Sequence, residues 1–381
     1  MRIGIDARSV YPGHGGIGTY ARELARALAR VDGHNEYLLF CTERKGTEPI
    51  VVAPNVRELI CPAAMLDWRW EQLELPTLAQ TVGLDVLHLT CFTAPIAKTC
   101  AVVSTVHDVV FHVRPDLVEP KLAAYLSRWA EFAARQADRL IAVSQHARQA
   151  IADAYGTPLA RIAVVYEAPG REFCPRDRAE AAERVRSRFG IDGSYCLYVG
   201  ALEPKKNIDG LLDAFAELVS DGFSEGSLVL VGGRGGMPYD IEQAVLLRRL
   251  QDSVRLLGYV PEAELPFLYR AAAVFIYPSL YEGFGLPPLE AMACGTPTIV
   301  SNSTSLPEVV GDAALLADPE DPGQLADAMA RVLQDSALSA ELSRKGVERS
   351  GNFTWEEAAR GTLRVYESAA TEGGRSNRCE C

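Results

Sequence analysis

The sequence predicts two α/β domains, each built on a parallel β-sheet with helices on both faces. Its length of 381 residues exceeds what a single hydrophobic core normally serves. Short, wholly apolar runs alternate with longer segments of helical periodicity, a pattern typical of parallel strands that are buried on both faces. This alternation stops near residue 168 and begins again near residue 195, so a doubly wound sheet is expected on each side of that point.

The first half should contribute five strands and two long helices. Each expected strand is a run of mainly apolar residues, and each expected helix repeats its apolar residues every three or four positions. The expected strands are 2–6, 36–41, 86–89, 102–106 and 140–143, and the expected helices are 19–30 and 120–137.

The second half repeats the scheme after a polar, proline-containing joint at residues 168–190. Its expected strands are 195–199, 227–231, 254–257, 274–277 and 298–301, and a helix follows at 208–218. Thr354 and Glu357 form a capping box that predicts a last helix. We therefore expect domains at 1–170 and 190–352, with a helix at 353–370 that packs back toward the first domain.

Charge is unevenly distributed between the two halves. Residues 1–175 carry a net charge of −1 and residues 176–381 one of −11, so a nucleic acid is not an expected partner. Arg22, Arg26 and Arg30 are spaced to share one helix face. This stripe is either an ordinary solvated surface or a contact for an anionic membrane or a lipid-phosphate acceptor.

The sequence predicts neither a membrane span nor a metal site. No apolar run approaches the roughly 20 residues that cross a bilayer, and the chain does not open with a charged-then-apolar leader. Its nine cysteines lack C-x-x-C spacing, and its six histidines are dispersed. We expect a cytoplasmic protein without a metal or other cofactor, with peripheral contact at the inner face of the membrane as the alternative.

A glycine-rich segment follows the first strand and introduces a helix. Residues 13–18 formally satisfy G-x-G-x-x-G, so a nicotinamide-dependent enzyme is one interpretation. Six residues separate Asp6 from the first glycine, however, and only Glu43 is available as the acid near the second strand. In the alternative interpretation, bare backbone amides approach a diphosphate at Gly15, Gly16 and Gly18.

The most informative segment is Tyr281–Glu290, which reads YEGFGLPPLE and follows an apolar strand. Its two glycines let the backbone turn, and its two prolines suit a first helical turn whose free amides attract phosphate. Glu282 lies in the turn and Glu290 about one turn into the helix, so both carboxylates can accept sugar hydroxyls. The alternative is an ordinary loop with two solvated glutamates.

The segment after the strand 195–199 carries a candidate cation. Asn207 is the expected cap of the following helix, and Lys206 lies just outside the helix start, where a cation could neutralise a leaving pyrophosphate. The alternative is that Lys205 and Lys206 are an ordinary surface pair.

Further candidates lie at strand ends of the first half. His107 directly follows the strand 102–106, with Asp108 available to bond its ring. Ser144 and His146 occupy equivalent places after the strand 140–143 and are weaker candidates. Because ligands of doubly wound sheets bind at the carboxyl ends of the strands, we expect a site in a cleft between the two domains.

Four segments together resemble the family-4 retaining glycosyltransferases, whose GT-B architecture consists of two Rossmann-like domains. They are Gly15–Gly18, His107–Asp108, Gly200–Asn207 and Glu282–Gly295, and the similarity extends to Trp355. The E-x7-E block with its Glu-Ala-Met-Ala-Cys-Gly-Thr-Pro continuation is the most specific part. The resemblance implies transfer of a hexose from a nucleoside diphosphate sugar to a hydroxyl of a glycan, lipid-linked or small-molecule acceptor, with retained configuration and without a metal.

The same resemblance implies roles for individual residues. Glu282 would contact the donor sugar, Glu290 the nucleotide ribose and Lys206 the diphosphate, while His107 would approach the transferred sugar. The expected catalytic residues are His107, Lys206 and Glu282, and the expected donor-binding residues are Gly15, Gly16, Gly18, Lys205, Gly283, Phe284, Gly285, Leu286 and Glu290.

The chain departs from the family pattern at one position. Many members have an arginine directly after the glycine equivalent to Gly200, where this sequence has Ala201, so Lys205 or another cation must replace that charge. The Glu-Pro-Lys-Lys-Asn variant is similar to a bacterial subgroup with mannosyl- and rhamnosyltransferases of polysaccharide assembly. This similarity favours a mannose-type sugar carried on GDP.

Three other functions are compatible with the architecture: a sugar phosphorylase, a nucleotide-sugar epimerase and a non-catalytic sugar-binding scaffold. A phosphorylase needs a second anion site and an epimerase a different set of bases, and the sequence suggests neither. Trp68 and Trp70 are expected to pack, although either could stack on a sugar ring. The expected cleft loops of the first domain leave the acceptor undefined.

Overall fold

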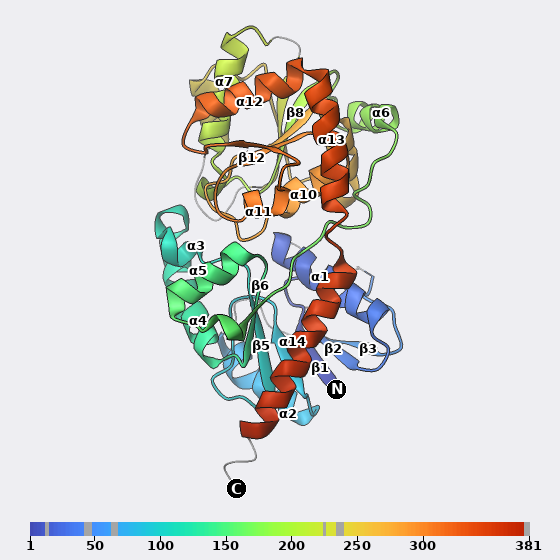
Figure 1. The fold of residues 1–381 in the computed structure, drawn as a ribbon, viewed down its shortest axis with the longest axis vertical. Coiled ribbons are helices and arrows are strands. Elements are labelled where there is room, and N and C mark those ends of the chain that lie inside the picture. Colours follow the sequence, from blue (N-terminus) through green and yellow to red (C-terminus); the bar gives the residue numbers. More distant parts are fainter. Residues whose placement is uncertain (12–14, 42–47, 62–67, 224–225, 234–239, 377–381) are drawn as a thin grey trace. The chain divides into compact units, whose positions relative to one another are not determined.

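The computed structural model describes residues 1–11, 15–41, 48–61, 68–223, 226–233 and 240–376. The chain divides into two compact units (Figure 1). The first comprises residues 1–113, 121–167 and 354–381, and the second comprises residues 114–120 and 168–353. Each unit is a parallel sheet flanked by helices, as the sequence predicts.

The sheet of the first unit has the order β3-β2-β1-β4-β5-β6-β7, and all its neighbouring strands are parallel. The five predicted strands are present to within one residue at either end. The two unpredicted strands lie at the edges, where β3 is half exposed and β7 has only three residues. The strands are β1 Arg2–Asp6, β2 Glu36–Cys41, β3 Val56–Ile60, β4 Val86–Leu89, β5 Ala101–Val106, β6 Arg139–Ala142 and β7 Ile162–Val164.

The helices of the first unit include the last helix of the chain. Helix α14 packs against α1 and against strands β4, β5 and β6, so the end of the chain completes the first unit. A π-helical turn at Trp70–Glu74 precedes α2. The helices are α1 Gly15–Val31, α2 Leu75–Thr81, α3 Val110–Val113, α4 Pro120–Gln136, α5 Gln145–Tyr155 and α14 Trp355–Ser376.

The sheet of the second unit has the order β10-β9-β8-β11-β12-β13 and is also parallel. Its strands are β8 Tyr195–Val199, β9 Ser227–Val231, β10 Val254–Gly258, β11 Val274–Tyr277, β12 Thr298–Ser301 and β13 Leu315–Ala317. Its helices are α6 Arg178–Phe189, α7 Ile208–Ser220, α8 Ile241–Leu247, α9 Leu265–Ala271, α10 Leu286–Ala293, α11 Leu306–Val310, α12 Pro322–Gln334 and α13 Ser336–Ser350.

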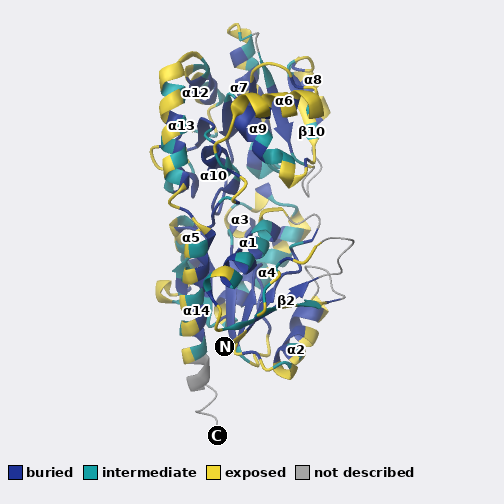
Figure 2. Ribbon diagram, turned by 90° about the vertical axis from the view of Figure 1, so that its right-hand side faces the viewer, coloured by how far each residue is buried: buried dark blue, intermediate teal, exposed yellow. Residues whose placement is uncertain are grey.

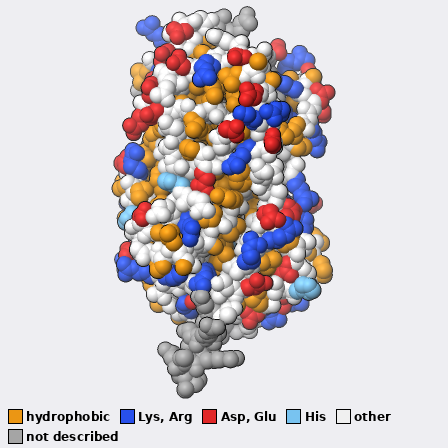
Figure 3. Space-filling view, in the orientation of Figure 1, with side chains coloured by type: hydrophobic (Ala, Val, Ile, Leu, Met, Phe, Trp, Pro, Cys, Tyr) orange, Lys and Arg blue, Asp and Glu red, His pale blue; other side chains and the backbone are white. Residues whose placement is uncertain are grey.

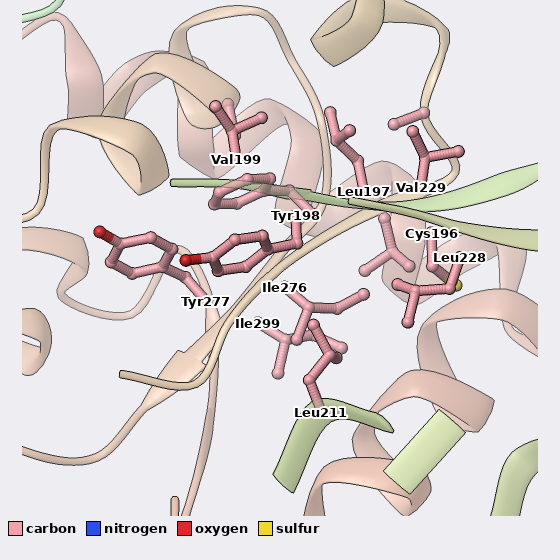
Figure 4. Packing of buried hydrophobic residues seen from close by; sticks show 14 of the residues in the cluster. Cys196, Leu197, Tyr198, Val199, Leu211, Leu228, Val229, Ile276, Tyr277 and Ile299 are labelled. Carbon is pink, nitrogen blue, oxygen red and sulfur yellow. The ribbon is translucent and has the colours of Figure 1, made fainter. Parts of the chain in front are cut away.

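Burial of the central strands positions the loops that follow them. Figure 2 shows the strands largely buried and the outer helix faces exposed. In the core of the second unit, Leu211 of α7 packs among residues of β8, β9, β11 and β12 (Figure 4). Each fully buried aliphatic or aromatic side chain contributes about 1.5–3 kcal/mol. Tyr198 and Tyr277 stack at 5.9 Å where this core meets the ends of β8 and β11.

Two arginines bond the segment around Cys174 and Arg178 to helix α9 and the residue after it. Buried Arg270 donates from Nε to the Cys174 carbonyl at 2.8 Å, and Arg178 donates to the Ala272 carbonyl at 3.0 Å. The residues expected to form a joint, 168–190, therefore include helix α6, which packs on α9.

The three arginines of the basic stripe on α1 pair with carboxylates. Arg22 and Arg26 pair with Glu23, and Arg30 pairs with Glu356 at 3.0 Å. Charges of both signs are interspersed on the face drawn in Figure 3. Within the described residues, no helix is both long and apolar enough to span a bilayer.

Trp70 packs as expected, with its ring 6.3 Å from that of Phe40, but Trp68 is 46% exposed.

Candidate functional site

The candidate site of the second unit is formed by loops at the carboxyl ends of β8, β11 and β12, which are neighbours in the sheet. The loop after β8 contains a 3-10 turn, Pro204–Lys206. The loop after β11 leads into α10, and the loop after β12 leads into α11. Because parallel strands end at the same edge, segments distant in the sequence meet here.

Lys206 and Glu282 form a buried ion pair at this edge. Lys206 Nζ donates to Glu282 Oε1 at 2.5 Å and to the Tyr277 hydroxyl at 2.8 Å. Burial alone would raise the pKa of Glu282, but the charges of Lys206 and Lys205 outweigh it and the pKa is lowered. The carboxylate therefore stays ionised and can accept hydrogen bonds.

Hydroxyl side chains after β12 hold the backbone around Glu282. The Glu282 amide donates to Thr304 Oγ1 at 3.0 Å, while Ser305 Oγ lies 3.0 Å from the Glu282 carbonyl and 2.8 Å from that of Phe284. Sequence reasoning missed these residues. The available signal was the run SNSTS, a series of short polar side chains at a strand's carboxyl end.

Gly285 is required for the turn into α10. Its φ of +122° is disfavoured for side chains, and a Cβ there would lie 2.7 Å from the Leu306 side chain. Pro287 and Pro288 have no N–H, and Leu289 N donates to the Gly285 carbonyl at 3.4 Å. Within the part of the chain that the structure describes, no hydrogen bond is recorded from the amides of Gly285 and Leu286. The predicted anion site at this helix start thus has fewer amides than an ordinary first turn.

Glu290 is held from a neighbouring helix. The Tyr269 hydroxyl donates to Glu290 Oε2 at 2.9 Å, and Thr296 Oγ1 donates to the Tyr269 carbonyl at 2.7 Å. Burial and the Glu290 charge raise the pKa of Tyr269 well above its usual value, so the phenol remains a donor. The structure gives Glu282 and Glu290 different partners.

Ala201, where the chain departs from the family pattern, begins a loop whose following residues are largely buried or half-buried. Ala201 is exposed, and its carbonyl accepts from the Tyr198 hydroxyl at 3.0 Å. Lys205 Nζ lies 3.7 Å from Glu203 Oε1. Asn207 precedes α7 as predicted, but it does not cap the helix with its side chain. It adopts a left-handed backbone instead, and its side-chain amide donates to the Pro319 carbonyl at 2.6 Å.

The loops after β8 and β9 approach each other closely. Gly232 has a φ of +144°, and a Cβ there would lie 1.8 Å from the Gly200 carbonyl oxygen. Only glycine fits such an approach without backbone movement. This glycine pair defines the start of the Lys206 loop, and sequence reasoning had identified only Gly200.

In the first unit, His107 is bonded through both ring nitrogens. Nε2 lies 2.9 Å from the Thr90 carbonyl, which can only accept, so Nε2 carries a proton. Nδ1 lies 3.2 Å from Glu167 Oε1. The ring nitrogens thus bond to Glu167 and Thr90, whereas the Asp108 carboxylate accepts from the Val110 amide at 3.1 Å.

The three predicted glycines at α1 have different structural constraints. A Cβ at Gly18 would lie 2.4 Å from the Ser9 carbonyl oxygen, so packing alone requires glycine there. Gly15 has a φ of +49°. Gly16 has an ordinary φ and no atom within 4 Å of an added Cβ, so the described residues give no packing reason for it. Residues 13 and 14 of the predicted motif lie outside the described residues.

The weaker candidate Ser144 is structural, because its hydroxyl accepts from the Ala147 amide at 2.9 Å and caps α5.

Among the described side chains, no group of three or more His, Cys, Asp or Glu residues could hold a metal ion.

Comparison with known proteins identifies the family. Residues 14–168 match Glycosyltransferase Family 4, and residues 181–349 match Glycosyl transferases group 1. O-antigen chain mannosyltransferase B of Escherichia coli is 36% identical over 265 residues, which is 70% of this chain and 70% of that protein. The chain belongs to the family-4 glycosyltransferases. This assignment excludes the nicotinamide interpretation of the glycine-rich segment.

Two further similarities extend over nearly the whole length of this glycosyltransferase. The D-inositol 3-phosphate glycosyltransferase of Salinispora arenicola (strain CNS-205) is 30% identical over 414 residues, covering 96% of this chain and 91% of that protein. HepE of Anabaena, solved in complex with UDP and glucose, has 18% identity and a TM-score of 0.74, covering 97% of this chain and 100% of that chain. The structural similarity confirms the GT-B fold.

Proposed function

We propose that this glycosyltransferase moves a hexose from a nucleoside diphosphate sugar to an acceptor hydroxyl and retains the anomeric configuration. The buried pair of Lys206, in the loop before α7, and Glu282, in the loop before α10, carries the proposal. Similarity to an O-antigen chain mannosyltransferase favours a mannose-type donor on GDP and an acceptor in glycan or glycoconjugate synthesis. The UDP complex of HepE is compatible with nucleotide binding by this fold.

We assign stabilisation of the leaving diphosphate to Lys206 and the amides of Gly285 and Leu286. Bonds to Glu282 and Tyr277 hold the ammonium group in place before any ligand arrives. Preorganised donors that face developing negative charge are usually the largest catalytic contribution. Lys205, whose charge also lowers the pKa of Glu282, is the second cation and takes the place of an arginine at Ala201.

We assign Glu282 to the hydroxyls of the donor sugar and Glu290 to those of the ribose. An ionised carboxylate accepts several hydrogen bonds, and each glutamate is oriented by a bond to a neighbouring side chain. In the proposed step, the bond from the anomeric carbon to the leaving phosphate breaks as the bond to the acceptor oxygen forms on the same face. The acceptor proton passes to the departing phosphate.

In the first unit, we assign diphosphate contacts to the amides of Gly15 and Gly16. We propose that His107 approaches the transferred sugar. The His107 ring nitrogens bond to Thr90 and Glu167, so His107 acts by its fixed position and not as a free base.

Nucleotide release tests the proposal directly. The protein is incubated with GDP-mannose or UDP-glucose, with and without mannose-terminated oligosaccharides, and the nucleotides and sugars are quantified. A transferase releases nucleoside diphosphate and extends the acceptor with a retained anomeric configuration, which NMR reads. Conversion of a donor's sugar into its epimer, still attached to the nucleotide, would indicate an epimerase. The absence of any turnover would favour a scaffold. We expect activity to survive excess chelator, and complete loss that magnesium or manganese restores would contradict the cation-and-amide site.

A further inference from the structure

A buried hydrogen-bond chain in the first unit connects the last helix to the surroundings of His107. The Tyr366 hydroxyl of α14 lies 2.7 Å from His88 Nδ1, and His88 Nε2 lies 2.7 Å from Thr105 Oγ1. Thr105 Oγ1 in turn lies 3.0 Å from the Tyr20 hydroxyl of α1. All four side chains are completely buried, so each hydroxyl or ring nitrogen depends on its neighbour in the chain for a partner.

Tyr20 is the member of this chain that contacts His107. The two rings meet edge to face with centroids 4.9 Å apart and an interplanar angle of 89°. On another side, Tyr20 lies 6.1 Å from the ring of Trp355, the first residue of α14. Helix α14 therefore reaches Tyr20 in two ways: Trp355 contacts its ring directly, and Tyr366 is linked to its hydroxyl through His88 and Thr105.

Apolar packing would attach α14 without this polar chain. Ala358, Ala359, Val365 and Ala369 are already buried on the helix. Apolar contacts tolerate small shifts along a helix, whereas a fully satisfied buried network fixes one arrangement. The polar chain thus specifies where Tyr20, two residues after Gly18, stands relative to the sheet.

We propose that Tyr366 is a positioning residue for the transfer reaction: acting through His88, Thr105 and Tyr20, it fixes the ring of His107. The inference rests on the proposed role of His107. Helix α14 begins after residue 349, where the second family match ends, so neither family match includes it.

Tyr366→Phe tests the inference, with Tyr37→Phe as its matched control. Tyr37 is also buried in the first unit, and its hydroxyl donates to Asp32 Oδ2 at 2.5 Å, outside the hydrogen-bond chain from Tyr366 to Tyr20. Both variants lose one buried hydroxyl. All four tryptophans, residues 68, 70, 129 and 355, belong to the first unit, so tryptophan emission compares its unfolding in the two variants.

We expect Tyr366→Phe to lower kcat for GDP release from GDP-mannose by about tenfold, since small misplacements near a reacting group are costly. Its affinity for GDP should be unchanged, because Tyr366→Phe removes none of the groups assigned to the ribose or the diphosphate. Tyr37→Phe should lower the melting temperature with kcat unchanged. Equal losses of kcat in both variants, or none in Tyr366→Phe, would overturn the positioning role.

A double-mutant cycle with His107→Ala separates this inference from the proposed function. If Tyr366 acts through His107, adding Tyr366→Phe to His107→Ala should produce no further loss of kcat. Additive losses of kcat would refute only the positioning role of Tyr366. So would a large loss of kcat in His107→Ala together with an unchanged kcat in Tyr366→Phe. An unchanged kcat in His107→Ala would refute the role of His107 as well. Should Tyr366→Phe not fold, Thr105→Val with Thr105→Ser as its rescue interrupts the same chain, and equal kcat in that pair would overturn the inference.

Discussion

Lys206 Nζ and Glu282 Oε1 lie 2.5 Å apart, and only about a tenth of either side chain is exposed. The two predicted catalytic residues, 76 positions apart, are thus direct partners. A buried ion pair contributes little net stability when intact, but removing one partner strands the other charge at a cost of about 3–5 kcal/mol. The pair therefore couples the folding of the second unit to its proposed chemistry.

Lys206→Ala should reduce turnover by roughly 10²-fold or more, because it removes a preorganised cation. Initial rates of nucleotide release measure the loss. Lys205→Ala should have a smaller effect, because Lys205 is the second cation and its charge acts on Glu282 less than that of Lys206. If both variants are silent, the diphosphate site is elsewhere.

Stability distinguishes a buried pair from two independent side chains. Glu282→Ala and Lys206→Ala should each lower the melting temperature. The double variant should lose less stability than the sum of the two single losses. Circular dichroism at increasing temperature measures this coupling. Strict additivity would show that the pair has no energetic linkage.

Glu290→Ala should weaken nucleoside diphosphate binding by about 1.5–3 kcal/mol, the range for hydrogen bonds to a charged group. Isothermal titration with GDP measures the change. Tyr269→Phe, which removes only the phenol that orients Glu290, should have a smaller effect. Unchanged GDP affinity in a folded Glu290→Ala protein contradicts the ribose assignment.

Gly16→Ala should affect donor binding, whereas Gly18→Ala should affect stability. A Cβ at Gly16 meets nothing within 4 Å, so stability should be unchanged while affinity for GDP-mannose falls. A Cβ at Gly18 would meet the Ser9 carbonyl at 2.4 Å, so this variant should unfold at a lower temperature. Tryptophan emission and donor titration give the two readouts. If Gly16→Ala binds donor normally, the backbone at this position does not contact the donor.

Stability of the first unit should depend on pH through His88. Burial and the charge of His107 lower the pKa of His88 from 6.5 to about 3. Between these values the unfolded chain binds a proton and the folded chain does not, so stability falls as pH decreases, by up to about 1.4 kcal/mol per pH unit. Above pH 6.5 this contribution is constant. Unfolding curves for wild type and His88→Gln, followed by tryptophan emission, should diverge between pH 6.5 and 3, whereas parallel curves would refute the assignment.

The central strands could be predicted because they are apolar along their whole length, as β8 and β11 show. Edge strands β3, β7 and β13 were missed, since a half-exposed or three-residue strand leaves no such run. Sequence patterns identify Lys206 and Glu282 separately, but only the parallel sheet shows that they touch. The bond from His107 to Glu167 could not be predicted either, because the two residues are 60 positions apart and no local pattern links them.

The discontinuity of the first unit has a consequence for synthesis of the chain. Its core includes Trp355, Ala359 and Tyr366, which follow the entire second unit in sequence. A nascent chain can therefore finish the second unit while the first still exposes the faces of α1, β4, β5 and β6 that α14 covers. Until α14 leaves the ribosome, the ring of His88 lacks the Tyr366 hydroxyl and the ring of Tyr20 lacks Trp355. The first unit consequently matures only after the second unit has been translated, and a stop codon before α14 would damage the domain that was translated first.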